Sequence, residues 1–311
     1  MNKPAFAAAL DRDVPLVIDG GLATQLEAQG CDISNPLWSA SLLLDQPDAI
    51  VMACRAFLDA GAECIATASY QASHEGFAQR GLSASEADEL MLLSVELALR
   101  ARADFLAASP DSSFRPLVAA SIGPYGAMLH DGSEYRGDYG VSAAVLRDFH
   151  EKRLRLFDTS NADVLACETV PSLLEARVLA DLLAGCETPS WVSFSCCDER
   201  HVSDGTPVEE AAAVFRGHDQ VLAVGLNCTP PRFATELVKR FSRALPGKAV
   251  IVYPNSGEVW NADTGSWSGL ASPIDYARAA NEWVAAGARI AGGCCRTGPA
   301  HIAAMRAALG R

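Results

Sequence analysis

Three cysteines have the spacing and surroundings of metal ligands. Cys294 and Cys295 are adjacent and follow Gly292 and Gly293 at the end of an apolar segment, and Cys228 ends an earlier apolar segment with the sequence Gly-Leu-Asn-Cys. Three thiolates brought together would hold zinc and leave its fourth coordination position open. Such a site binds an incoming thiol as a thiolate near neutral pH while leaving its sulfur nucleophilic. The chemistry that these residues predict is alkyl transfer to sulfur.

The remaining cysteines are not expected to bind the metal. A buried cysteine in a strand is usually a small apolar side chain, and this interpretation applies to Cys31, Cys54, Cys64, Cys167 and Cys186. Cys196 and Cys197 form a second adjacent pair at the end of a predicted strand, so spacing alone does not separate the two pairs. A charged run, residues 198–200, follows this second pair and no diglycine precedes it. We therefore predict loop or core cysteines at this position.

The elements that must position these residues can be read from hydrophobic periodicity. Eight short segments rich in β-branched residues are predicted strands, at residues 16–19, 64–69, 117–121, 164–168, 191–195, 222–228, 250–254 and 289–293. Helical patterns lie between them, the clearest at 85–108, where Ser85 is the predicted N-cap and Asp88 the residue at N3. Eight strand-then-helix units predict an α/β protein, a single-domain (β/α)8 TIM barrel.

The connections indicate which face of the barrel carries function. Long segments follow predicted strands, at residues 20–46, 70–83, 123–140 and 255–273, whereas short turns such as 60–62 precede them. In this fold the loops that follow the strands form the catalytic face. Because Cys228, Cys294 and Cys295 fall at such strand ends, the barrel is expected to gather them at one mouth.

Polar residues at other strand ends predict a site for an amino acid. Asp19 and Glu168 are carboxylates that suit an ammonium group, and the backbone amides around Gly20-Gly21 suit a carboxylate. Thr67 and Asn255 end two more strands on the same face. Helix capping or loop hydrogen bonding is the alternative interpretation for each of these residues.

Charge and hydropathy limit the partners. The formal net charge is −13, and the sequence shows no cluster of positive residues that would form a nucleic-acid-binding surface. No apolar run approaches the roughly 20 residues that span a bilayer, and the N-terminal apolar stretch is too short for a signal peptide. Ten cysteines without an evident disulfide framework suit a reducing compartment. We expect a cytoplasmic protein with no nucleic-acid or membrane partner.

Five motifs occur together in one order along the chain. They are Asp19-Gly20-Gly21-Leu22-Ala23-Thr24, Asn35-Pro36-Leu37-Trp38-Ser39-Ala40, Thr67-Ala68-Ser69-Tyr70-Gln71-Ala72, Gly123-Pro124-Tyr125-Gly126-Ala127 and Gly292-Gly293-Cys294-Cys295-Arg296-Thr297. With these motifs the chain resembles the homocysteine S-methyltransferases over nearly its whole length. The resemblance implies a homocysteine-binding barrel over residues 1–311, with Zn2+ on Cys228, Cys294 and Cys295. It also implies L-homocysteine with its sulfur on the zinc and its amino-acid end near Asp19, Gly20, Thr67 and Glu168, and methionine as the product.

The resemblance further implies a sulfonium methyl donor. The sequence ends at Arg311, soon after Cys295, which within the family favours the stand-alone S-methylmethionine-using type over betaine-using and cobalamin-dependent relatives with added segments. S-Adenosylmethionine is a second donor, although no G-x-G-x-x-G loop follows the first predicted strand. Aromatic faces for a sulfonium are expected from Trp38, Tyr70, Tyr125 or Trp260, with loop packing as the alternative.

Two alternative functions remain open from the sequence. Selenocysteine or another small thiol is an alternative acceptor, because the metal chemistry does not depend on the carbon chain that carries the nucleophile. A noncatalytic thiol- or metal-binding barrel is the alternative of another class, with a closed four-thiolate zinc site that takes one ligand from Cys196 or Cys197. We expect a monomer.

Overall fold

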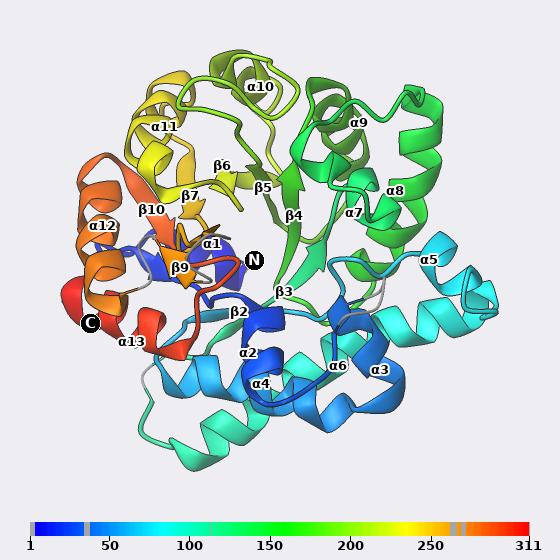
Figure 1. Cartoon of the computed structure of the whole chain (residues 1–311), viewed down its shortest axis with the longest axis horizontal. Helices are drawn as coiled ribbons and strands as arrows, with labels where there is room; N and C mark the ends of the chain where they lie inside the picture. The colour runs from blue at the N-terminus through cyan, green and yellow to red at the C-terminus, as the bar shows by residue number, and fades with distance from the viewer. Residues whose placement is uncertain (1–3, 34–37, 113, 262–265, 269–271, 311) are drawn as a thin grey trace.

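Eight parallel strands form a barrel around one axis. The computed structural model describes residues 4–33, 38–112, 114–261, 266–268 and 272–310 (Figure 1). The barrel strands are β1 (Leu16–Val17), β2 (Cys64–Ala66), β3 (Leu117–Ile122), β4 (Val164–Val170), β5 (Ser190–Phe194), β6 (Val221–Asn227), β7 (Ala249–Tyr253) and β10 (Ala288–Ala291). Their order in the sheet is β1-β10-β7-β6-β5-β4-β3-β2. A parallel bridge between Ile18 and Cys64 joins the two end strands, so the sheet closes on itself.

Helices surround this barrel, most of them around its outside, as Figure 1 shows. They are α1 (Ala5–Leu10), α2 (Leu22–Ala28), α3 (Leu42–Asp45), α4 (Pro47–Asp59), α5 (His74–Ala78), α6 (Ala84–Ala108), α7 (Tyr125–Leu129), α8 (Ala143–Asp158), α9 (Leu173–Leu183), α10 (Val208–Ala213), α11 (Pro231–Ala244), α12 (Pro273–Ala285) and α13 (Pro299–Ala308), with 3-10 turns η1 (Trp38–Ser41) and η2 (Ser133–Tyr135). In α11, Ala234, Leu237, Val238 and Phe241 are buried at helical spacing. This spacing places one apolar stripe against the sheet.

The predicted (β/α)8 barrel is confirmed, and each predicted strand overlaps an observed one. The strands are buried on both faces, which explains why they appear in the sequence as continuous apolar runs. The predicted cap of the longest helix is wrong by two residues. Ser83 is the N-cap of α6, its hydroxyl accepts from the Glu86 amide, and the Glu86 carboxylate accepts from the Ser83 amide. Ser85 and Asp88 have the same spacing, but they lie inside the helix and Asp88 is one methylene shorter than glutamate.

The end of the barrel opposite the long loops is closed by the first helix. Phe6 of α1 is fully buried, and its ring centroid lies 5.8 Å from that of Trp191 inside the barrel. Arg12 follows α1 and donates two hydrogen bonds to the buried Glu63 carboxylate, at 3.0 and 3.2 Å. The described residues therefore leave the barrel open to substrate at the end where the strands finish.

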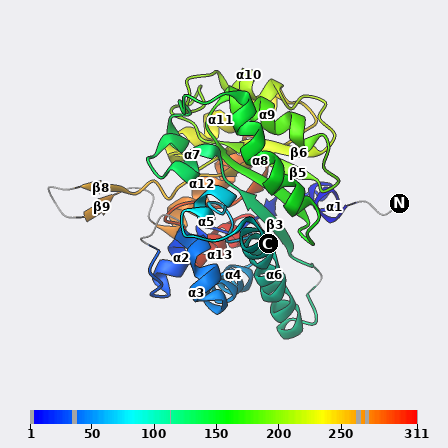
Figure 2. The same ribbon diagram turned by 90° about the vertical axis from the view of Figure 1, so that its right-hand side faces the viewer.

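The connection after β7 contains an element that we did not predict. Residues 255–273 were expected to be a loop, but Val259–Asn261 (β8) and Ser266–Ser268 (β9) pair as an antiparallel hairpin. Figure 2 shows this hairpin projecting away from the barrel, at the end opposite the N-terminus. Among the described residues, no helix is long and apolar enough to cross a membrane.

Candidate active site

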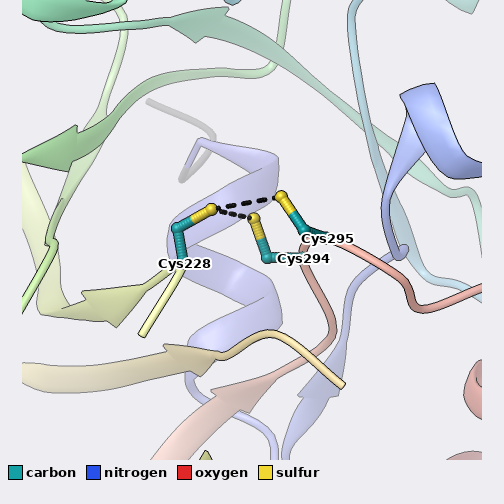
Figure 3. Close-up of side chains that lie close together, drawn as sticks. All are labelled: Cys228, Cys294 and Cys295. Carbon is teal, nitrogen blue, oxygen red and sulfur yellow. Dashed lines mark hydrogen bonds between the residues drawn. The ribbon is translucent and has the colours of Figure 1, made fainter. Parts of the chain in front are cut away.

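The three predicted metal ligands lie together at the mouth of the barrel. The Sγ atom of Cys228, which follows β6, is 2.9 Å from that of Cys294 and 3.5 Å from that of Cys295, both of which follow β10. Figure 3 shows the three side chains pointing toward one another. We call Cys228, Cys294 and Cys295 the thiol cluster. Their three Sγ atoms all lie within 4.8 Å of one another, and no other group of three or more histidine, cysteine, aspartate or glutamate side chains in the described part of the chain is this close.

Backbone contacts from the strand between β6 and β10 hold this cluster. The Cys228 amide donates to the Tyr253 carbonyl, at the end of β7, over 3.3 Å. Beyond β7, the Pro254 carbonyl accepts from the Cys294 amide at 2.9 Å, and the Ser256 amide donates to the Cys295 carbonyl at 3.0 Å. Cys228 itself has a positive φ of 47°, an uncommon conformation for a residue with a side chain. The backbone after β7 therefore fixes both halves of the cluster.

Two glycines allow the first and last barrel units to interlock beside the cluster. A Cβ on Gly21 would lie 2.6 Å from the Cys294 carbonyl oxygen, and one on Gly293 would lie 2.2 Å from Thr297 Oγ1. The Gly21 amide donates to the Thr297 carbonyl at 2.9 Å, and the Gly293 amide donates to the Asp19 carbonyl at 2.9 Å. Only a residue without a side chain allows backbones to approach this closely.

The donor set of the cluster suits a soft divalent metal. All ten cysteines of the chain are free thiols. Hydrogen bonds from Cys228 and Cys294 hold the pKa of the Cys295 thiol well below its usual range. Thiolate ligands favour zinc among the common divalent ions, and three protein ligands leave a coordination position open. The residues present therefore fit a metal centre with one exchangeable position.

The thiol cluster forms one wall of a pocket in the barrel mouth. Trp191 and Tyr253 also line it, and the Tyr253 hydroxyl accepts from Trp191 Nε1 at 3.1 Å. Tyr70 and Tyr135 contribute aromatic side chains from the loops that follow β2 and β3. The pocket therefore combines a sulfur-rich wall with aromatic surface.

The two predicted carboxylates lie in this same pocket. Asp19 Oδ2 accepts from the Ala66 amide at 2.7 Å, whereas Glu168 Oε1 is buried without a hydrogen-bond partner. Burial, with a smaller contribution from the neighbouring Glu168 charge, raises the pKa of Asp19 to about 8. Burial likewise raises the pKa of Glu168 to about 7. Two buried carboxylates that form no ion pair with any described residue are suited to a positively charged ligand group.

The other predicted substrate residues have mixed outcomes. Gly20 and Thr67 line the pocket, although the Thr67 hydroxyl also accepts from the Ser121 amide at 3.0 Å. Gly21 lines it too, but its amide is occupied by Thr297, which contradicts the expectation that this amide binds a carboxylate. Asn255 is not among the pocket-lining residues. Its backbone amide donates to the Thr229 carbonyl at 3.1 Å, and its side-chain Oδ1 is buried without a hydrogen-bond partner.

Cys196 and Cys197 stay outside the thiol cluster, as predicted. Cys196 is buried near the Phe194 carbonyl, and the exposed Cys197 donates to the Val202 carbonyl at 3.4 Å. Neither belongs to the group of ligand atoms formed by the cluster, so the described residues do not support a closed four-thiolate site. Tyr125 packs against the rings of Tyr139 and Phe149 and does not line the pocket. The side chains of Trp38 and Trp260 lie outside the described residues.

Several polar residues of the pocket were given no role by sequence reasoning, among them Glu134, Tyr135 and Asn227. Glu134 and Tyr135 lie in the segment 123–140, one of the long segments expected on the catalytic face, in which only Tyr125 was given a role. Asn227 directly precedes Cys228 in the Gly-Leu-Asn-Cys motif, and it is also buried in the pocket wall. The length of the first segment and the adjacency of Asn227 to a ligand were the signals available in the sequence.

Comparison with known proteins agrees with this geometry. The sequence model of the family described as homocysteine S-methyltransferase matches residues 16–309. The chain belongs to the homocysteine S-methyltransferase family. It is 45% identical over 296 residues to homocysteine S-methyltransferase YbgG of Bacillus subtilis (strain 168), with 94% of each chain covered. It is 44% identical over 311 residues to homocysteine S-methyltransferase of Escherichia coli (strain K12), with 98% of each covered.

A solved structure extends the agreement to the fold. The crystal structure of the homocysteine methyltransferase MmuM from Escherichia coli, in its metallated form, superposes with a TM-score of 0.87 at 42% identity. The alignment covers 98% of this chain and 99% of that one. The predicted family and the enzyme class, methyl transfer to homocysteine, are therefore confirmed.

Proposed function

We propose that this homocysteine S-methyltransferase is zinc-dependent and takes its methyl group from S-methylmethionine, with S-adenosylmethionine as a second donor. One observation carries the proposal: the pocket that contains the thiol cluster also contains two buried carboxylates, Asp19 and Glu168, neither of which forms an ion pair with a described residue. A thiol site beside an ammonium site matches the two ends of homocysteine. The product is methionine.

The chain's own residues bind and orient homocysteine. Asp19 and Glu168 would pair with its ammonium group, which would stabilise their ionised forms in a buried setting. Gly20, Gly21 and Thr67 would shape the pocket around the amino-acid end. Asn255, whose Oδ1 is buried without a hydrogen-bond partner, is the one predicted substrate residue that does not line the pocket. Binding at both ends would aim the sulfur at the methyl carbon, which is the main requirement of an in-line displacement.

Cys228, Cys294 and Cys295 would hold the metal. Zinc on three thiolates supplies an open position that favours the thiolate form of an incoming thiol. Cys228 is buried and Cys294 and Cys295 are half-buried, and the backbone contacts after β7 keep the three side chains in one arrangement. Little proton transfer is required of the protein, because the proton of the thiol is lost on binding and the donor departs as a neutral thioether.

The pocket suits a sulfonium donor. Tyr70 and Tyr135 provide aromatic faces, and a cation over such a face gains about 0.5 to 2 kcal/mol when it is desolvated. Glu134, buried in the same wall, adds a further carboxyl group. A sulfonium loses its charge on methyl transfer, so the product thioether is released from these groups more readily than the donor.

The remaining parts of the proposal concern the setting of the enzyme. Residues 1–311 act as one homocysteine-binding domain, and the enzyme works as a monomer without a nucleic-acid or membrane partner. Ten free cysteines support a reducing, cytoplasmic location. Selenocysteine and other small thiols are the alternative acceptors to be compared with homocysteine.

The decisive experiment measures methionine formation by the zinc-loaded enzyme. Homocysteine is supplied with S-methylmethionine, S-adenosylmethionine or betaine in separate reactions, each beside a chelator-treated control. We expect fastest turnover with S-methylmethionine and loss of turnover after chelation. Fastest turnover with betaine would overturn the proposed donor, and full activity after verified metal removal would overturn the role of zinc. Replacing homocysteine with selenocysteine under the same conditions compares the acceptors.

A further inference from the structure

Asn227 uses its side chain to join two strands that are not neighbours in the sheet. It is the last residue of β6, directly precedes Cys228 and is 1% exposed. The Thr169 amide donates to Asn227 Oδ1 at 2.7 Å, and Asn227 Nδ2 donates to Thr169 Oγ1 at 2.8 Å. Thr169 belongs to β4, and β5 lies between the two strands. Both polar atoms of the Asn227 amide are therefore bonded to one residue across the barrel mouth.

Thr169 has a backbone conformation that requires such support. Its φ is 60°, in the left-handed region, which β-branched residues rarely adopt. The register between β4 and β5 shifts between Cys167 and Val170, so the intervening residues form a bulge. Bulges beside active sites redirect a side chain, and they persist only when the surrounding structure holds them. The paired hydrogen bonds from Asn227 hold this one.

The bulge connects Asn227 to the substrate pocket on two sides. Glu168, the other bulge residue, lines the pocket with its carboxyl group. On the β6 side, the chain passes directly from Asn227 into Cys228 of the thiol cluster. Homocysteine has its thiol and its ammonium a fixed number of bonds apart. Both ends can be bound at once only while the two protein groups keep a matching separation.

We propose that Asn227 is a positioning residue, which sets the separation between the thiol cluster and the Glu168 carboxylate by holding Thr169 in its left-handed conformation. The proposal rests on the proposed function, since it takes one homocysteine molecule as bound at both ends. The role is assigned through Thr169 because the Asn227 Oδ1 and one N–H of its Nδ2 are both bonded to that residue.

A second-site rescue tests this role. The variants are Asn227→Ala, Thr169→Gly and the double variant, and the readouts are KM and kcat for homocysteine, homocysteine affinity by calorimetry, and zinc affinity by chelator competition. We expect Asn227→Ala to raise KM about tenfold and to change zinc affinity by less than about twofold. Thr169→Gly should restore most of this loss in the double variant, because glycine adopts a positive φ without support.

A second acceptor gives an independent test, because a general structural defect would weaken the binding of both acceptors. 4-Mercaptobutanoate has the thiol and carboxylate of homocysteine but lacks the ammonium. With this acceptor, the KM values of wild type and Asn227→Ala should differ by less than about twofold, because neither protein can form the contact between Glu168 and an ammonium group. Asn281→Ala, at an exposed position on α12, is the matched control and should behave as wild type with either acceptor.

Several outcomes would overturn the proposal. These are an unchanged KM in Asn227→Ala, a KM defect that Thr169→Gly does not relieve, or a loss of zinc affinity as large as the loss of homocysteine affinity. If Asn227→Ala does not fold, Thr169→Val removes only the hydroxyl contact and should still raise KM several-fold, and an unchanged KM would count against the role. Calorimetry needs no methyl donor, so failure of the proposed donor is distinguishable from failure of this inference.

Discussion

The Tyr135 hydroxyl lies 3.4 Å from Cys228 Sγ and so joins the loop after β3 to the thiol cluster. Tyr135 ends η2, and 42% of the residue is exposed although its hydroxyl reaches the buried sulfur. Hydrogen bonds to a metal ligand orient that ligand and adjust its charge. The loop after β3 therefore supports the cluster as well as lining the pocket.

Tyr135→Phe is expected to weaken zinc binding. Loss of one outer contact to a ligand typically lowers metal affinity by about ten- to a hundredfold, and we expect the lower end because the three thiols remain. Chelator competition on the purified protein measures the change. Tyr125→Phe is the matched control, since Tyr125 packs on Tyr139 and Phe149 away from the pocket. Equal zinc affinity in the two variants would assign the Tyr135 contact to loop packing alone.

Removal of one cluster thiol should abolish both metal content and activity. Cys294→Ala leaves two thiols, which do not suffice for a tightly held zinc centre. Cys196→Ala should leave metal content and turnover nearly intact, because Cys196 is buried outside the cluster. Elemental analysis together with methionine formation measures both properties. Retained zinc in the first variant, or lost zinc in the second, would contradict the ligand assignment.

Glu168→Gln should weaken homocysteine binding without releasing zinc. The substitution keeps the size of the side chain and removes the charge that would pair with the ammonium group. An ion-assisted contact of this kind contributes about 1.5 to 3 kcal/mol, so we expect a rise in KM of about tenfold or more. Zinc content should equal that of wild type. Unchanged homocysteine affinity would return Glu168 to a purely structural role.

Homocysteine affinity should increase with pH between about 6 and 8. Burial raises the pKa of Glu168 to about 7 and that of Asp19 to about 8, so both carboxyls are largely protonated at pH 6 and gain charge above these values. Only the charged forms attract an ammonium group. The increase should be smaller in Glu168→Gln, which removes the group that titrates near 7 and leaves thiol ionisation unchanged. Identical pH profiles for the two proteins would contradict this explanation.

The apolar layer between the barrel and its helices should dominate stability. Phe241 of α11 is fully buried and stacks on Phe194 with ring centroids 6.0 Å apart. Phe241→Ala should lower the free energy of unfolding by about 3 to 5 kcal/mol, measured by urea denaturation. Val145→Ala, at a residue that is 43% exposed, should change it by less than about 0.5 kcal/mol. Similar losses in both variants would show that burial does not control the effect.

The strand pattern could be predicted because the barrel strands are buried on both faces. Ala249–Tyr253, for example, is almost entirely apolar, and such a run predicts a buried strand without knowledge of which strands lie beside it. The N-cap of α6 was missed because two serines have the required spacing and the choice depends on which carboxylate reaches back. The β8–β9 hairpin was missed because its strands are only three residues long each. Three residues are too few to show the alternation of apolar and polar side chains that identifies a strand.

The cluster could be predicted because its ligands are chemically distinctive and end strands of one barrel. Tyr135 and Asn227 were missed for a different reason. Each is an ordinary polar residue whose importance comes from a contact with a residue 93 or 58 positions away. Similarly, the occupied amide of Gly21 depends on its contact with Thr297, which lies 276 positions away. Such pairings depend on loop conformation, which the pattern of the sequence does not encode locally.

The interlock between Gly21, Gly293 and Thr297 links metal capture to the order of folding. The thiol cluster takes its sulfurs from the ends of β6 and β10, and the backbone that follows β1 packs against the β10 end, so the cluster is complete only after the last strand has joined the sheet. A chain that stalls before β10 joins β7 keeps Cys228 apart from Cys294 and Cys295, which leaves too few thiolates together to retain zinc. Contacts between segments this distant in sequence form slowly. Retention of zinc would therefore distinguish completed barrels from incomplete ones during synthesis or refolding.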